Sequence, residues 1–116
     1  MLKTFAPSAA SSPLPYGEGN ASPFSSSISL DLRFRNGNRH GFMYAYLFDV
    51  AYDASELIRL TFGGTQVEIR GRNLSDLYEK LLVHGVGYTQ ESSQAPPLEI
   101  DTRPHIETIS ILKIEE

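Results

Sequence analysis

The sequence ELIRLTFGGTQVEIR, residues 56–70, constrains the fold more than any other part of the chain. Two runs with alternating apolar residues flank Gly63–Gly64, and glycine suits a two-residue hairpin turn because the turn needs positive φ. This turn sets Phe62 opposite Thr65, and all later pairs follow from that one. The apolar residues of both runs then share one face, whereas a shift by one residue would separate them. The sequence therefore predicts an antiparallel hairpin with one apolar face.

Two runs upstream of the hairpin extend it into a sheet. Residues 28–35 alternate between apolar and polar side chains, which is typical of a half-buried strand. Residues 42–52 are apolar on both faces, which favours a central strand. One of those faces is mainly aromatic, with alternate positions occupied by Phe42, Tyr44, Tyr46, Phe48, Val50 and Tyr52.

Turn residues separate these runs and determine how they pair. A loop over residues 35–39 sets Leu32 opposite Phe42, which keeps the apolar residues of both strands on one face. A three-residue loop over residues 53–55 brings the aromatic stripe to the same face as the apolar residues around Gly63–Gly64. We therefore expect four strands in a continuous antiparallel meander with one apolar face.

A helix over residues 74–84 is predicted to cover that apolar face. Asn73 is a favourable N-cap, and Asp76 stands where a capping-box partner belongs. Gly85 follows as a typical left-handed residue after the end of the helix. Apolar residues recur at helical spacing, at Leu74, Leu77, Tyr78, Leu81 and Leu82.

The remaining segments complete the expected fold class. Residues 86–90 and 105–114 have extended patterns and add up to two strands. The sequence thus predicts a single α+β domain over residues 28–116, with an antiparallel meander sheet of four to six strands and one helix packed on its aromatic face. Residues 1–27 are rich in Ser, Pro, Ala and Gly without apolar periodicity, so we expect a disordered tail. A second interpretation is that this tail is an extension from a misplaced start codon.

Composition removes several classes of chemistry. The chain has no cysteine, which excludes thiolate nucleophiles and disulfides, and the cytoplasm is the expected location. No apolar run approaches the roughly 18 residues that a membrane helix needs, so we expect no membrane partner. The net charge of −4 comes from residues 91–116, whereas residues 28–90 carry seven basic and seven acidic side chains. A balanced body does not attract nucleic acid strongly.

The sequence shows no catalytic or metal-binding motif, such as a nucleophile elbow, a P-loop or a metalloprotease helix. Asp49 and Glu68 could form a catalytic carboxylate pair, but the predicted register places Arg59 between them in an ion-pair ladder across three strands. We therefore expect no enzyme activity, no metal and no cofactor. The three histidines have no second ligand at metal spacing: His40, His84 and His105.

Arginines form two groups, with Arg33, Arg35 and Arg39 in one and Arg70 and Arg72 in the other. Together with the tyrosines and phenylalanines, they suggest weak RNA or nucleotide binding as a second hypothesis. The predicted register argues against it, because the aromatic side chains lie on the helix-covered face and the two arginine groups lie at diagonal corners of the sheet. Nucleic-acid binding is therefore the less favoured alternative.

The sheet face opposite the helix carries an apolar strip of Met43, Ala45, Leu47 and Leu57. Such a strip on an otherwise polar face is a candidate interface. Alternatively, residues 98–114 fold back and cover it. The favoured hypothesis is a noncatalytic binding or assembly module, in which a protein partner or a second copy binds this face or an exposed sheet edge.

Overall fold

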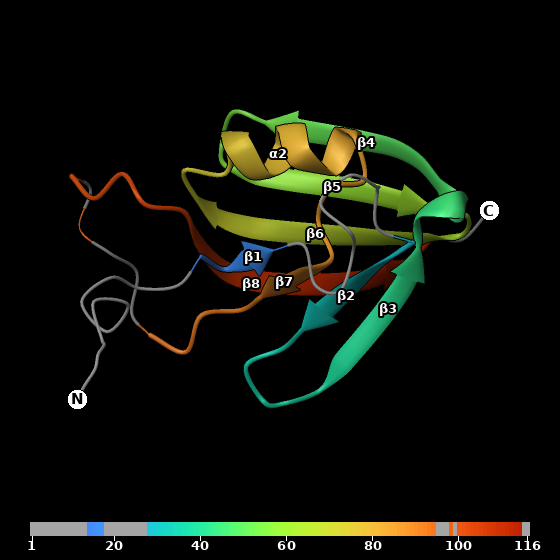
Figure 1. The fold of residues 1–116 in the computed structure, drawn as a ribbon, viewed down its shortest axis with the longest axis horizontal. Helices are drawn as coiled ribbons and strands as arrows, with labels where there is room; N and C mark the ends of the chain where they lie inside the picture. The colour runs from blue at the N-terminus through green and yellow to red at the C-terminus, as the bar shows by residue number, and fades with distance from the viewer. Residues whose placement is uncertain (1–13, 18–27, 95–97, 99, 115–116) are drawn as a thin grey trace, which may run out of the picture.

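The computed structural model describes residues 14–17, 28–94, 98 and 100–114. Figure 1 shows how these residues form strands and an α-helix around one core. In chain order the elements are β1 (Tyr16–Gly17), β2 (Ser29–Arg33), β3 (Arg39–Met43), the 3₁₀ turn η1 (Tyr44–Tyr46), β4 (Leu47–Asp53), β5 (Leu57–Phe62), β6 (Thr65–Arg72), α2 (Ser75–Leu82), β7 (Tyr88–Gln90) and β8 (His105–Lys113).

The strands form two four-stranded sheets rather than one meander. Sheet A has the order β1-β7-β2-β3 and sheet B the order β4-β5-β6-β8. Sheet B is antiparallel throughout, whereas sheet A is mixed because β7 runs parallel to β2. The predicted α+β class, with one helix packed on an antiparallel sheet, is confirmed for the described residues. The expected composition of that sheet is wrong. The first predicted strand, β2, belongs to sheet A, and the fourth strand of sheet B is β8.

The run over residues 42–52 is two strands and not the single central strand that its pattern favoured. The η1 turn interrupts it and carries the chain from β3 in sheet A to β4 in sheet B. Tyr44 explains the break, because its side chain is buried and its hydroxyl donates to the backbone oxygen of Val86 at 2.6 Å. A straight strand would keep Tyr44 and Tyr46 on one face, whereas the turn buries the first and exposes the second.

The β5–β6 hairpin has the predicted register, with Phe62 opposite Thr65 and Arg59 opposite Glu68. The two hairpins before it keep the predicted faces but slip by two residues. Leu30, not Leu32, lies opposite Phe42, because the β2–β3 loop closes one residue earlier than expected.

The loop between β4 and β5 comprises Ala54–Glu56, so it begins one residue later than expected. Glu56 closes it in the left-handed conformation, with a φ of 68°. Both slips are even, and an even slip leaves each side chain on its face.

A β-bulge at the start of β4 turns Phe48 toward solvent. Leu47 pairs with Phe62 and Asp49 with Thr61, which leaves Phe48 without a partner on β5. A bulge of this kind re-aims the side chain of the extra residue. The expectation that Phe48 lies on the core face is therefore wrong.

The helix α2 covers the core as predicted, but its ends differ from the prediction. Asn73 is not the N-cap: it has a φ of 59°, and its side-chain amide donates to the backbone oxygens of Asp101 and Arg103, each at 2.9 Å. The carboxylate of Glu56 instead accepts the backbone N–H groups of Asn73 and Leu74 at 3.1 and 3.2 Å. This distant carboxylate therefore binds the N–H of the N-cap residue Leu74 and that of Asn73 just before it.

The C-terminal end of α2 is a Schellman motif displaced by one residue from the prediction. His84, not Gly85, takes the left-handed conformation, with a φ of 57°. The N–H groups of His84 and Gly85 donate to the backbone oxygens of Leu81 and Lys80 at 3.1 and 2.8 Å. The His84 ring stacks on Tyr44 with centroids 4.5 Å apart, which holds this end of the helix against η1.

Part of the segment predicted as a tail belongs to the core. Tyr16 and Gly17 form β1 and pair with β7, and the Tyr16 side chain is buried. Its hydroxyl donates to the Asp76 carboxylate at 2.9 Å, and burial together with Asp76 raises the pKa of Tyr16 to about 12. The prediction of disorder is therefore wrong for these residues, and the rest of residues 1–27, apart from residues 14–15, lies outside the described part of the chain.

The Glu91 carboxylate connects sheet A to the outer edge of β8. One of its oxygens accepts the backbone N–H of Arg35 at 2.9 Å and the other accepts that of Ile109 at 2.8 Å. The Arg35 guanidinium donates in turn to the backbone oxygen of Glu107 at 2.6 Å. Residues 105–113 therefore extend sheet B at its edge, and they do not fold over its open face as one interpretation expected.

The helix offers a matched pair of leucines for a stability test. Leu81 is fully buried and its neighbour Leu82 is half exposed. Leu81→Ala should lower the free energy of unfolding by about 2–5 kcal/mol, because it leaves a cavity in the core. Leu82→Ala should cost less than about 1 kcal/mol, and urea denaturation measures both. Equal losses would show that α2 does not cover the core.

Glu91 and Glu107 provide the corresponding test of the connection between the sheets. Glu91→Ala leaves the N–H groups of Arg35 and Ile109 without their acceptor, which should lower the free energy of unfolding by about 1–3 kcal/mol. The exposed side chain of Glu107 is the control, and Glu107→Ala should stay within about 0.5 kcal/mol. A harmless Glu91→Ala in the same urea titrations would contradict the role given to this carboxylate.

Candidate interaction surface

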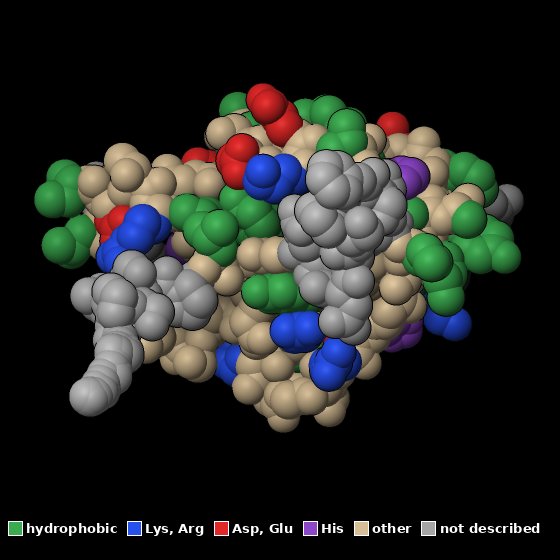
Figure 2. Space-filling view, viewed as in Figure 1, with side chains coloured by type: hydrophobic (Ala, Val, Ile, Leu, Met, Phe, Trp, Pro, Cys, Tyr) green, Lys and Arg blue, Asp and Glu red, His purple; other side chains and the backbone are tan. Residues whose placement is uncertain are grey.

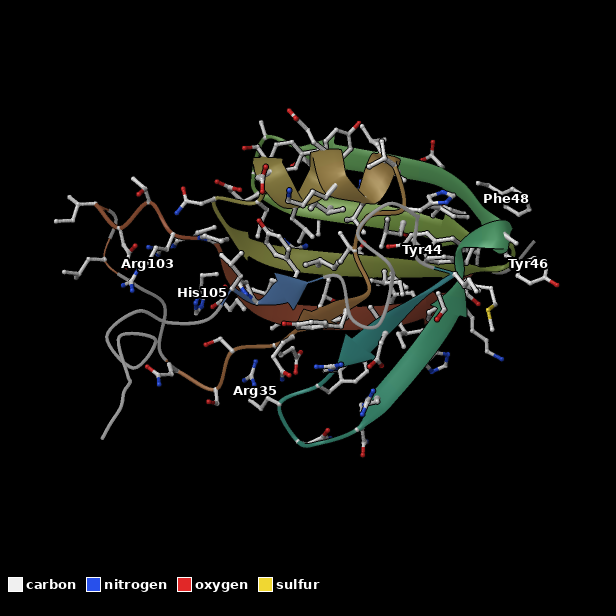
Figure 3. All side chains as sticks on the ribbon, in the orientation of Figure 1. Arg35, Tyr44, Tyr46, Phe48, Arg103 and His105 are labelled. Carbon is white, nitrogen blue, oxygen red and sulfur yellow. The ribbon has the colours of Figure 1, made fainter. Side chains whose placement is uncertain are left out.

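Three large apolar side chains are exposed at the connection between the two sheets. Met43 ends β3, Tyr46 ends η1 and Phe48 is the bulged residue of β4, with 51%, 62% and 71% of their surfaces exposed. Figure 3 shows Tyr46 and Phe48 projecting from the same end of the molecule. The turn and the bulge together bring these side chains out of the core.

The end of β8 adds two more apolar side chains to this region. Across sheet B, Leu47, Phe62, Thr65 and Lys113 are successive partners, so the end of β8 and the start of β4 lie at the same end of the sheet. Figure 2 shows hydrophobic side chains gathered at this end. We define the apolar end surface by its exposed members, which are Met43, Tyr46, Phe48, Leu112 and Ile114.

Buried contacts hold the connection beneath this surface in place. Tyr44 stacks on His84, and its hydroxyl is bonded to the backbone oxygen of Val86. Burial raises the pKa of Tyr44 well above its usual value, so this hydroxyl stays protonated and donating. Tyr46 and Phe48 therefore project from an anchored segment.

Of the strip expected on the open sheet face, Met43 is exposed as predicted. Leu47 is half-buried and packs against the core, and Leu57 is buried. Neither lies on the exposed strip that the single-meander register implied; Leu47 directly follows the break at η1, which that register did not include. Sequence reasoning instead placed Tyr46 and Phe48 on the core face and so missed them. The length of the run could have indicated the break, because residues 42–52 are about twice as long as a typical strand of five to six residues.

The first arginine group is paired with acidic side chains. Asp31 accepts hydrogen bonds from Arg33 at 3.0 Å and from Arg39 at 2.5 Å. Partial burial would raise the pKa of Asp31, but the bonds and charges of these two arginines outweigh it and lower the pKa below its usual value. The Arg33 guanidinium also lies 4.0 Å above the centre of the Tyr88 ring. Arg35, the third member, faces Glu91 at 3.9 Å.

The second arginine group lies along β6. Arg70 is exposed opposite Thr108, and Arg72 is opposite His105 in β8. Because Arg35 binds the backbone of Glu107, β8 separates the two groups, and they do not occupy diagonal corners of one sheet as predicted. Figure 3 shows Arg35 well away from Tyr46 and Phe48.

Several other polar candidates have structural contacts. Arg59 and Glu68 form the predicted ion pair at 3.2 Å, but Asp49 lies opposite Thr61 and not in that row. His40 stacks on Phe42 with centroids 4.5 Å apart. Within the described ranges, no three His, Asp or Glu side chains are close enough together to hold a metal ion.

No helix in the described part of the chain has the length and apolar character needed to cross a membrane. No known family model matches the chain, and no curated protein or solved structure matches it significantly.

The pairing of Asp31 predicts how the protein responds to polyanions. The full chain should bind generic single-stranded RNA more weakly than about 10⁻⁴ M at physiological salt. Asp31→Asn removes the charge that neutralises Arg33 and Arg39, so it should raise RNA affinity and steepen its salt dependence. Asp101→Asn, which frees Arg103 elsewhere, is the control and should change affinity less. Fluorescence anisotropy measures all three.

The opposite result in these titrations would favour the nucleic-acid hypothesis. In that result the unmodified protein binds RNA with micromolar affinity. The slope of log affinity against log salt concentration then falls by about one in each of Arg35→Ala and Arg72→Ala.

Proposed function

We propose that this protein is a noncatalytic binding module that recognises a protein partner through the apolar end surface. Aromatic and methionine side chains are enriched where protein interfaces are most buried. Met43, Tyr46 and Phe48 provide such side chains on one connection, beside the half-buried Leu47. The absence of cysteine fits action in a reducing compartment such as the cytoplasm.

The exposure of Phe48 is the observation that carries this proposal. Burying a phenylalanine side chain stabilises a protein by about 1.5–3 kcal/mol, and the regular register would have buried it. The bulge turns it outward instead, next to the exposed Tyr46. A neighbouring cluster of exposed large apolar side chains typically marks an interaction site.

The alternative of RNA or nucleotide binding has less support. Arg33, Arg35 and Arg39 all have acidic neighbours within 4 Å, so a phosphate would have to compete with Asp31 and Glu91 for them. That competition reduces the gain from each phosphate contact.

Site-specific photo-crosslinking tests the proposal. Benzoylphenylalanine in place of Phe48 should capture a discrete partner in the cells that produce the protein. The control is the same group in place of Ile100, which is 86% exposed but outside the apolar end surface. The purified partner should then bind Phe48→Ser at least about tenfold more weakly, with the melting temperature unchanged. Equal capture from both positions, or unaltered affinity of Phe48→Ser, would contradict the proposal.

A further inference from the structure

The outer edge of β4 has no strand partner among the described residues. Sheet B ends at β4 on one side and at β8 on the other. The segment that follows β7 occupies the β8 edge, where Ser92 donates to the backbone oxygen of Ile106 at 2.9 Å and Glu91 accepts from Ile109. An edge without such partners presents backbone groups on which another strand can pair.

The register identifies the backbone groups that face outward. In an antiparallel ladder, alternate residues exchange their hydrogen bonds with the same neighbour. The two-residue Gly63–Gly64 turn fixes which residues of β5 bond to β6 and which bond to β4. By this alternation, the backbone N–H and C=O groups of Asp49 and Asp53 point toward β5. Val50 and Tyr52 then direct their N–H and C=O groups away from the sheet. A second strand can bond to β4 at these two residues.

One face of the β4 edge is acidic. Asp49 and Asp53 are exposed two residues on either side of Ala51, and β4 contains no basic residue. Hydrogen bonds from Ser55, together with the weaker influence of the charges of Arg59 and Arg70, hold the pKa of Asp53 below its usual value, so it is charged at neutral pH. Arg59, opposite Ala51, is paired with Glu68. Arg70 lies on β6, two strands away from the edge and across Leu57 from Asp53, so the charges on the edge strand itself are the two aspartates. The charge of this face therefore complements lysine or arginine side chains.

The other face of the same edge is apolar. Tyr52 of β4 stacks on Tyr78 of α2, with ring centroids 5.6 Å apart. Leu82 lies one helical turn beyond Tyr78 on the same flank of α2, and half of its surface is exposed. Figure 1 shows α2 lying alongside β4. A strand added to β4 would place every second side chain against this flank.

We propose that β4 binds an extended segment of a partner protein by strand addition, and that the segment alternates basic and apolar side chains. Its basic residues face Asp49 and Asp53, and its apolar residues face Tyr78 and Leu82. This inference rests on the proposed function, because Phe48 belongs to the apolar end surface and is also the second residue of β4.

A second copy of this chain is a poorer occupant of the edge. In twofold antiparallel pairing of β4 with β4, residues 49, 51 and 53 of both copies share one face of the joined sheet. Asp49 and Asp53 then contribute four carboxylates to that face, directly opposite or diagonal to one another. Like charges at such positions destabilise strand pairing. A basic segment reverses the sign of each of these interactions.

Fluorescence anisotropy with the full chain and a labelled peptide tests the proposal. The probe is a peptide of about eight residues that alternates lysine and valine, long enough for a typical strand. It should bind at least about tenfold more tightly than a glutamate–valine peptide of the same length. N-methylation of alternate backbone nitrogens, which keeps charge and side chains but removes the donors facing β4, should weaken binding by about tenfold.

Matched protein variants locate the site. Asp49→Lys should weaken binding of the lysine–valine peptide about tenfold, whereas Glu107→Lys, the same charge change on β8, should alter it less than twofold. Equal effects of the two variants, or tight binding of the methylated peptide, overturn strand addition at β4. A dimer of the full chain that the peptide dissociates assigns the edge to a second copy and also overturns the proposal.

The two proposals can fail separately. No binding of the lysine–valine peptide overturns strand addition, even when Phe48 crosslinks a partner. Peptide binding without crosslinking at Phe48 supports strand addition and removes the apolar end surface from the interface.

Discussion

The Glu91 carboxylate is the interaction on which the arrangement of the two sheets depends. Among the described residues the sheets share no strand, and apolar contacts between them are non-directional, so burial alone does not fix their relative position. Glu91 supplies the missing direction, because its two oxygens accept N–H groups from Arg35 beside sheet A and from Ile109 in sheet B. Its own N–H donates to the backbone oxygen of Arg33 at 2.9 Å, which continues the connection into β2.

Carboxylates elsewhere in the fold also satisfy structural partners. Glu56 accepts the N–H groups at the start of α2 and the hydroxyl of Tyr52, the latter at 2.9 Å. Asp31 joins β2 to β3 through Arg33 and Arg39. A sequence rich in arginine and tyrosine therefore does not yield a free basic surface at this hairpin. Within residues 28–90, further ion pairs join Arg59 to Glu68 and Lys80 to Asp76.

The β5–β6 hairpin was predictable because two independent constraints agree. The Gly63–Gly64 turn and the alternation of apolar residues each select the same register, and the structure has it. The α2 helix was predictable from its apolar spacing, but its N-terminal cap was not, because Asn73 and Glu56 find their partners in distant segments. Local propensity describes caps only when the capping group lies nearby in the sequence.

The candidate surface was not predictable from the same pattern. Alternation over residues 42–52 fits a strand that passes through the core and also two strands joined by a turn. Two features distinguish these alternatives: the buried Tyr44, whose hydroxyl donates to the Val86 backbone, and the bulge at Phe48. Both depend on tertiary contacts. The sequence interpretation included an exposed edge as a binding route, but it could not identify which edge, because β8 was not recognised as the partner of β6.

The two edges of sheet B illustrate how a free strand can be specific. The β8 edge is closed by bonds to the Glu91 carboxylate and the Arg35 guanidinium. The β4 edge has a bulge and two aspartates, features that natural proteins use to prevent edge-to-edge association. Repulsion of this kind rejects an acidic strand, including another β4, but it does not reject a basic one. Specificity often arises from such a selective penalty rather than from added attraction. The same aspartates can therefore keep copies of the chain apart and favour a partner of opposite charge.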